Sequence, residues 1–280
     1  MRKIGINYQY VSNMTREEQV KELVDMGFGA TFTMTHEIEE HDKLANVFAK
    51  YGLAYETIHA PFRGINDIWE NTEAGDNMYQ ILATCVDRCD MFGVPVMVVH
   101  MSSGVTPPPI TDVGRDRYEK LIEYAAQKDV KLAFENVRKL AHLAWIFEHF
   151  AENDTVKMCW DCGHETCYTP NVDFMKMFGH KVGCLHLHDN YGVINQDSHL
   201  LPFDGVTDFE KVAQKIKTSG FEGTLMLEVL QHGSQHYVGM THEEYLQKAA
   251  QAAKRLVKLT EERKCLYEIF NFTKSKAVQG

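Results

Sequence analysis

The sequence predicts a single (β/α)8 barrel that spans residues 1–280, and the alternation of its segments supports this prediction. Apolar stretches typical of strands alternate with amphipathic stretches typical of helices, without a flexible linker between them. This alternation favours one closed parallel barrel. The alternative is a doubly wound open sheet, but no Gly-x-Gly-x-x-Gly turn follows the first strand. The predicted strands span residues 3–7, 29–34, 54–59, 95–100, 130–135, 156–161, 182–187 and 224–229.

Glycine and threonine mark the boundaries of the predicted helices. Glycine tolerates the left-handed conformation that often ends a helix, so a glycine just before a strand indicates a helix end. Such glycines are Gly27, Gly52, Gly93 and Gly220. A Thr-x-x-Glu sequence predicts a capping box at a helix start. The three candidates are Thr15 with Glu18, Thr207 with Glu210, and Thr241 with Glu244.

The composition limits the classes of function. The net charge is −10, from 29 basic and 39 acidic residues, which makes binding to nucleic acid by broad phosphate neutralisation unlikely on electrostatic grounds. No apolar run reaches the roughly 18 residues that a membrane span needs. The first strand begins at once and leaves no room for a signal-peptide hydrophobic region. The seven cysteines are an odd number and are scattered, so we expect reduced thiols in a cytoplasmic protein.

Four ionisable residues close the last four predicted strands. They are Glu135, Asp161, His186 and Glu228. Ionisable side chains at the ends of buried strands are costly unless they are paired or bind a cation. In a barrel these strand ends face one active-site mouth. We therefore predict that the four residues bind one divalent ion, namely Mn, Zn, Co, Fe or Mg, because Ca²⁺ prefers oxygen ligands alone. A cluster of ion pairs is the alternative.

Further histidines lie at or beyond strand ends. His59 and His100 end the third and fourth strands, where each is either a metal ligand or a pocket residue. His164 comes three residues after Asp161, and His199 lies in the loop after the seventh strand. The sequence therefore predicts that His59, His100, His164 and His199 face the mouth of the barrel.

These residues occur in a recognisable order. The segments are His59-Ala60-Pro61, His100, Glu135-Asn136, Asp161-Cys162-Gly163-His164, His186-Leu187-His188-Asp189-Asn190, Asp197-Ser198-His199 and Glu228. In this order the chain resembles the xylose isomerase-like barrel superfamily. That superfamily includes sugar-phosphate isomerases and epimerases, ketose 3-epimerases, inosose dehydratases and endonuclease IV. The resemblance implies that Glu135, Asp161, His186 and Glu228 are the ligands of the common metal.

The resemblance has different implications in different branches of the superfamily. In the endonuclease branch, His59, His100, His164, Asp197 and His199 resemble additional ligands of a trinuclear zinc cluster. In the sugar branch, residues like His59 and His164 line the substrate pocket. Ketose 3-epimerases carry an arginine shortly after the seventh strand, and this chain has none between Asn190 and Asn195. Ala141 also stands near the position of a second glutamate of those enzymes.

We expect a metal-dependent isomerase or epimerase of a small sugar, polyol or sugar derivative. Glu135 and Glu228 would act as catalytic residues that transfer a proton at carbon through an enediolate. The expected substrate-binding residues are His59, His100, His164, His188 and His199. An endonuclease IV-like zinc phosphodiesterase and an inosose dehydratase-like lyase are the alternatives, and a carbohydrate-binding protein without catalysis is the non-enzyme alternative.

The last segment of the chain carries its own expectation. Residues 261–280 follow the last predicted helix and contain clustered apolar side chains. We expect this carboxyl-terminal extension to pack on the barrel or on a neighbouring subunit, and therefore expect that the protein can form a homo-oligomer.

Overall fold

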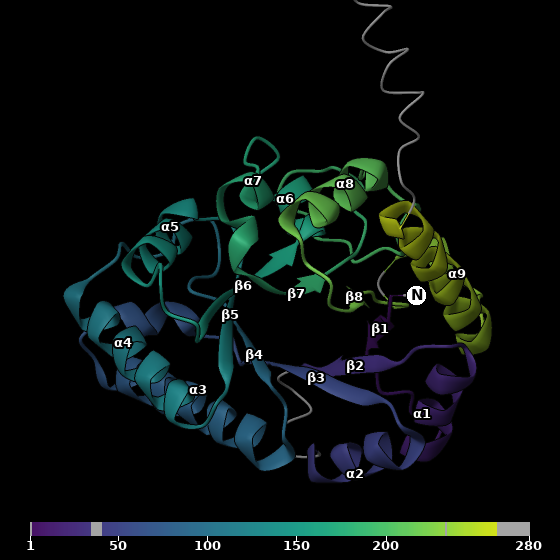
Figure 1. The fold of residues 1–280 in the computed structure, drawn as a ribbon, viewed down its shortest axis with the longest axis horizontal. Coiled ribbons are helices and arrows are strands. Elements are labelled where there is room, and N and C mark those ends of the chain that lie inside the picture. Colours follow the sequence, from purple (N-terminus) through teal and green to yellow (C-terminus); the bar gives the residue numbers. More distant parts are fainter. Residues whose placement is uncertain (1, 35–40, 233, 262–280) are drawn as a thin grey trace, which may run out of the picture.

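Eight parallel strands surround one axis, and helices cover their outer side (Figure 1). The computed structural model describes residues 2–34, 41–232 and 234–261. The strands are β1 (Ile4–Asn7), β2 (Ala30–Thr33), β3 (Ala54–His59), β4 (Val96–Val99), β5 (Lys131–Glu135), β6 (Val156–Asp161), β7 (Val182–His186) and β8 (Leu225–Leu227). Their order in the sheet is β7-β6-β5-β4-β3-β2-β1-β8. The predicted (β/α)8 barrel is confirmed.

The barrel closes between β7 and β8, beside the predicted metal ligands His186 and Glu228. β1 pairs in parallel with both β2 and β8. Between β7 and β8 the contact is a single parallel bridge that joins Leu187 to Leu227. The Leu187 amide donates to the Met226 carbonyl at 2.9 Å, and the Glu228 amide donates to the Leu187 carbonyl at 3.2 Å. This closure therefore fixes the backbone on both sides of the predicted ligands His186 and Glu228.

Most predicted strand limits agree with the structure within one or two residues. β3 and β6 match the predicted ranges 54–59 and 156–161. β4 ends at Val99 and β8 at Leu227, so His100 and Glu228 are the first residues after their strands. All eight strands run in parallel, so these positions still lie at the carboxyl end of the barrel.

Nine helices of the described residues follow or connect the strands. They are α1 (Arg16–Asp25), α2 (His41–Tyr51), α3 (Glu73–Phe92), α4 (Asp112–Gln127), α5 (Leu140–His149), α6 (Cys162–Cys167), α7 (Phe174–Phe178), α8 (Phe209–Ser219) and α9 (His242–Glu261). Short 3-10 turns are η2 (Ile65–Trp69), η3 (Gly179–Lys181) and η4 (Gln235–Tyr237). The predicted glycines have the left-handed backbone, with φ of 95° at Gly27, 68° at Gly52, 65° at Gly93 and 74° at Gly220.

Two of the three predicted capping boxes are confirmed, and one is wrong by one residue. Thr15 and Glu18 exchange side-chain to backbone hydrogen bonds at the start of α1, and Thr241 and Glu244 do the same before α9. In the third case α8 begins at Phe209, and its N-cap is Asp208 instead of Thr207: the Asp208 carboxylate accepts from the Lys211 backbone amide. The Thr207 amide is already bound to Asp189, so it belongs to the preceding loop.

A buried tryptophan holds the loop that follows β4. The Trp69 ring is fully buried, and its Nε1 donates to the Met101 carbonyl at 2.7 Å. The Thr111 hydroxyl donates to the Trp69 carbonyl at 2.6 Å. α4 lies directly against the ring, because a Cβ atom at Gly114 would lie 2.1 Å from it. The loop after β4 thus has a fixed path at the carboxyl end of the barrel.

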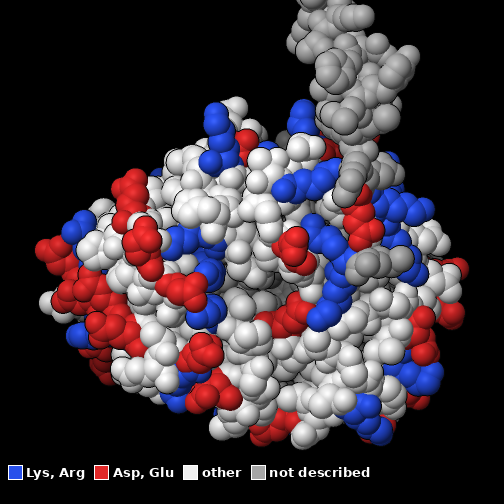
Figure 2. Space-filling view, in the orientation of Figure 1, with Lys and Arg blue, Asp and Glu red and all other residues white. Residues whose placement is uncertain are grey.

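On the face shown in Figure 2, Lys and Arg side chains are interspersed with Asp and Glu side chains. No helix of the described ranges has the length and apolar character to cross a membrane. The described cysteines are buried free thiols. The predicted extension over residues 261–280 lies, apart from Glu261, outside the described residues.

A buried histidine beside the end of β2 makes stability depend on pH. His41, at the start of α2, has no exposed surface, and its Nε2 lies 3.1 Å from the Thr33 hydroxyl. Burial lowers the pKa of His41 to about 4, and the Arg88 guanidinium acts in the same direction. His41 is therefore neutral in the folded protein at neutral pH.

We predict that His41→Gln makes the protein less sensitive to acid. Below about pH 6.5 the unfolded chain gains a proton on His41 that the folded protein does not accept until about pH 4. Stability should therefore fall by roughly 2–3 kcal/mol over this window in the parent protein, and the variant should lack this part of the loss. Urea unfolding between about pH 4 and pH 7 measures the free energy of unfolding of the parent protein and of the variant. The exposed His180 provides the control variant His180→Gln; equal pH slopes for both variants would refute the prediction.

Candidate metal and substrate site

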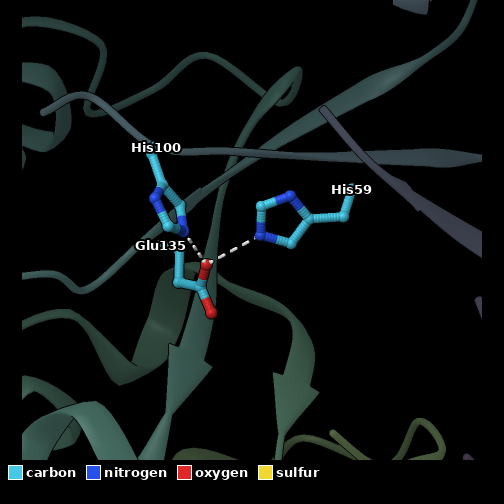
Figure 3. Close-up of side chains that lie close together, drawn as sticks. All are labelled: His59, His100 and Glu135. Atoms are coloured by element: carbon cyan, nitrogen blue, oxygen red, sulfur yellow. Dashed lines mark hydrogen bonds and ion pairs between the residues drawn. The ribbon is translucent and has the colours of Figure 1, made fainter. Parts of the chain in front are cut away.

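Glu135, at the end of β5, is the centre of a group of histidines. One carboxylate oxygen, Oε2, lies 2.5 Å from His100 Nε2 and 3.3 Å from His59 Nε2. Figure 3 shows both rings pointing toward this oxygen, His59 from the end of β3 and His100 from just after β4. The other oxygen, Oε1, lies 2.8 Å from His186 Nδ1. Glu135 is completely buried, so its two oxygens contact three imidazoles without competition from bulk water.

The four predicted metal ligands converge. One donor atom from each of Glu135, Asp161, His186 and Glu228 lies within 4.8 Å of the others. His186 Nδ1 lies between the two glutamates, 2.8 Å from Glu135 and 3.1 Å from Glu228. The exposed fractions of the four residues are between 0 and 4%. Among the described residues, no lysine or arginine pairs with these three carboxylates.

The turn from β6 into α6 fixes Asp161. The side chain of Asn136 binds the Asp161 backbone through two hydrogen bonds. Asn136 Nδ2 donates to the Asp161 carbonyl at 2.8 Å, and the Asp161 backbone N–H donates to Asn136 Oδ1 at 2.7 Å. Asp161 is also the N-cap of α6, where Oδ1 accepts from the His164 amide at 2.6 Å. The second oxygen, Oδ2, faces His188 Nε2 at 3.0 Å. One carboxylate thus starts a helix and still offers an oxygen to the site.

Close packing beside Asp161 requires glycine. A Cβ atom at Gly163 would lie 2.0 Å from the His188 ring, which leaves no space for any side chain. His188 itself has no exposed surface and stacks on His199 with ring centroids 4.3 Å apart. The His188 ring is therefore wedged between α6 and the loop after β7.

A second carboxylate gathers two further histidines. Asp197 Oδ2 lies 3.0 Å from both His164 Nε2 and His199 Nε2. The loop that holds Asp197 and His199 is organised by Asp189, whose carboxylate accepts four backbone amides. Their donors are Asn190, Phe203, Gly205 and Thr207. The long loop after β7 is therefore fixed by one buried carboxylate.

The site as a whole favours positive charge. Burial alone would raise the pKa of Glu135, but His186 and His100 hold it well below its usual value. Burial likewise lowers the pKa of His186, yet Glu228 and Glu135 raise it well above the ordinary histidine value. Against the same effect of burial, Asp161 and Asp197 raise the pKa of His164 to about 10. Glu135 is therefore ionised, and His186 and His164 carry a proton beside it.

The electrostatic pattern extends to the outer histidines. Burial lowers the pKa of His199, but Asp197 reverses this effect and brings the value to about 9. His100 behaves differently, because burial lowers its pKa more than Glu135 raises it. His59, His100, His164 and His199 all line one cavity of about 140 Å³ at the carboxyl end of the barrel, where the sequence places them. His188 does not line this cavity and lies behind its surface.

The residues present fit a divalent cation. The set of three carboxylates and one imidazole is rich in donors and buried, and its ion-pair partners among the described residues are histidines, of which His186 and His164 carry an additional proton. A cation that replaces those protons satisfies the same charge. Cys159 also comes within 4.8 Å of Glu135 and His186, but burial raises the pKa of its thiol well above the usual value, so the thiol is protonated.

Four polar residues that line the cavity were not assigned to the site from the sequence. They are Ser102, Ser103, Arg138 and Tyr168. Arg138 follows the strand-end residue Glu135 by three positions, the same separation as between Asp161 and His164. That spacing is a signal that sequence reasoning can use, because residues just past a strand end in a barrel face its mouth. The serines and Tyr168 have no comparable pattern, since their positions depend on how the loops fold.

Comparisons with known proteins agree with this architecture. A family model described as xylose isomerase-like TIM barrel matches residues 20–262. The uncharacterized protein y4fM of Sinorhizobium fredii is 25% identical over 246 residues, which is 75% of this chain and 76% of that protein.

Two solved structures share the fold over most of the chain. D-Psicose 3-epimerase from Clostridium cellulolyticum H10, solved with D-tagatose, has a TM-score of 0.74 at 13% identity and covers 93% of this chain and 100% of its own. The 3-keto-D-glucoside 4-epimerase YcjR from E. coli has a TM-score of 0.69 at 16% identity and covers 92% and 100%. At these identities the likeness shows the fold. Since the family model spans nearly all of the barrel, the chain belongs to the xylose isomerase-like TIM barrel family.

Proposed function

We propose that this protein is a divalent-metal-dependent isomerase or epimerase that acts on a small sugar, polyol or sugar derivative. The observation that supports this most is the placement of Glu135 and Glu228. They come from β5 and from the end of β8, flank His186, and both line the same cavity. Two carboxylates from different sides of one pocket suit the removal of a proton from carbon and its return.

The chain supplies the groups that such a reaction needs. Burial opposes ionisation, but His186 and His100 keep the pKa of Glu135 low and His186 does the same for Glu228, so both carboxylates are in the ionised form that a general base requires. Glu135, Asp161, His186 and Glu228 would hold the divalent ion, which would supply a Lewis acid for negative charge on substrate oxygens. In this proposal Glu135 and Glu228 exchange the proton at carbon.

The surrounding histidines orient the substrate. His59, His100, His164 and His199 line the cavity, and their ring nitrogens can bond to hydroxyl groups. A further histidine, His188, lies behind the residues that line the cavity. His188 contacts Asp161 Oδ2 and is buried, so we propose that it positions Asp161 and does not contact substrate. The epimerase names of the similar structures support the same class of reaction for this chain.

We predict that Glu228→Gln weakens metal binding by about 100-fold or more, because it removes a charged ligand from a buried site. The amide keeps the shape of the side chain, so the barrel should remain folded. Metal per chain by elemental analysis after dialysis against dilute chelator measures the effect. Glu123→Gln, on the exposed side of α4, is the matched control. Equal metal content in the two variants would contradict the ligand assignment.

The reaction class is tested by isotope exchange. The metal-loaded protein is incubated in deuterated water with ketoses, inososes and their phosphates. We expect deuterium at the carbon beside the carbonyl of one of these compounds, and we expect Glu135→Gln to abolish it. Loss of water from the labelled compound would identify an inosose dehydratase-like lyase, which shares the first proton transfer. No label in any compound would overturn the proposed reaction.

A zinc phosphodiesterase of the endonuclease IV type is the second candidate, and one observation favours it. The donor groups fall into three clusters, around the two oxygens of Glu135 and around Asp197. Groups of His59, His100 and Glu135, and of Asp161, His164 and His188, bring their donor atoms within 4.8 Å. Several cations in such an arrangement can activate water and neutralise a phosphodiester.

The number of bound ions separates the two candidates. We predict about one divalent ion per chain, measured by elemental analysis on protein saturated with zinc and then desalted. About three ions per chain, together with cleavage of abasic DNA, would transfer the assignment to the phosphodiesterase. Asp197→Asn is the informative variant, because it should leave a single-ion protein unchanged in metal content and remove an ion from a three-ion protein.

A further inference from the structure

Arg138 is the cation at the rim of the cavity. It lies in the loop between β5 and α5 and lines the same cavity as Glu135, His59 and His100. It is the one lysine or arginine among the described residues that line this cavity. A positive charge at this position faces the space that a substrate would fill.

Two contacts hold the guanidinium in place. Its central carbon lies 3.6 Å from the centroid of the Tyr168 ring, a distance typical of close cation–π stacking. Its Nε donates to Asn195 Oδ1 at 2.9 Å. Stacking and one hydrogen bond fix the plane of the guanidinium, so a ligand that binds it does not have to order a mobile side chain.

The charge of Arg138 has no acidic partner among the described residues. Within residues 2–34, 41–232 and 234–261, no carboxylate lies within ion-pair distance of Arg138, and neither terminal nitrogen has a hydrogen-bond partner. Arg138 therefore differs from Arg117, a buried arginine that donates to the carbonyls of Ile68 and Glu70 and to Asp76. The terminal fork of Arg138 remains available to a pair of acceptor oxygens.

The neighbouring loop adds hydroxyl donors to the same cavity. Ser102 and Ser103 follow β4 and line the cavity. Asn66 fixes this loop, because its side chain accepts from the Ser103 amide at 2.9 Å and donates to the Ser103 carbonyl at 3.0 Å. α5 begins two residues after Arg138, and no side chain caps it. Free hydroxyls, an open helix start and an unpaired guanidinium together favour an anion.

We propose that Arg138, with Ser102 and Ser103, binds an anionic group on the substrate, so that the preferred substrate is a sugar phosphate or sugar acid instead of a neutral sugar. This inference rests on the proposed function, and names the substrate class of that same site. The carboxylates bind the reacting end of the molecule through the cation, and Arg138 binds the phosphoryl or carboxylate oxygens at the rim. Arg138 is thus a specificity-determining residue.

Paired ligands test the proposal without a requirement for turnover. Calorimetry on the metal-loaded protein compares fructose with its monophosphates, and glucose with glucuronate. We expect one anionic ligand to bind about 10- to 100-fold more tightly than its neutral partner. Arg138→Gln should remove this preference and leave the neutral sugar unaffected, and Arg138→Lys should retain part of it because charge remains without the fork. The ligand pair that shows the effect identifies phosphate or carboxylate.

Arg255→Gln is the matched control, since Arg255 on α9 also stacks on an aromatic ring, 3.8 Å from the Phe203 centroid, and does not line the cavity. It should keep the full preference. The proposal is overturned if no anionic ligand binds more tightly than its neutral partner. It is also overturned if the Arg138→Gln variant keeps the preference, which would then come from the bound metal ion alone. A third contrary result is an equal loss of affinity for the anionic and the neutral ligand in this variant. If Arg138→Gln loses the preference for the anionic ligand and the parent protein shows no deuterium exchange in any sugar, the anion site is upheld and the proposed reaction is rejected.

Discussion

Three carboxylates buried around one imidazole set the constraint on which the rest of this site depends. Glu135, Asp161 and Glu228 lie at or near zero exposure around His186. Charges in such an environment are stabilised only by opposite charge and by hydrogen bonds. His186 and His164, whose pKa values lie above the ordinary histidine value, supply positive charge here, and a divalent ion can take the place of their protons. The charge requirement explains why so many histidines gather at one end of the barrel.

The backbone around the carboxylates is held as firmly as the side chains. Asn136 ties the end of β6 to the end of β5, and Asp161 caps the helix that presents His164. Asp189 gathers four amides of the loop after β7. Each of these residues binds backbone groups with its side chain, so the donors that face the cavity are positioned in advance. Positioning of this kind lowers the reorganisation needed when a ligand binds.

The cavity has two chemically distinct regions. The inner region contains the carboxylates and the imidazoles, and it favours a cation. At the rim Arg138 carries an unpaired positive charge, and it favours an anion. A ligand with polar hydroxyl or carbonyl oxygens at one end and negative charge at the other complements both regions, whereas an uncharged sugar complements only the first. The separation of the two regions therefore bears on which small carbohydrates the site can select.

The sequence by itself determined the barrel and the convergence of Glu135, Asp161, His186 and Glu228. Both follow from local patterns, because alternating segments imply parallel strands, and parallel strands bring their carboxyl ends to one edge. Only the tertiary structure decided where α8 begins, since Asp189 binds the Thr207 amide and leaves Asp208 to cap the helix. It alone placed His188 behind the cavity and Arg138 on its rim, because depth and loop paths depend on packing between distant segments.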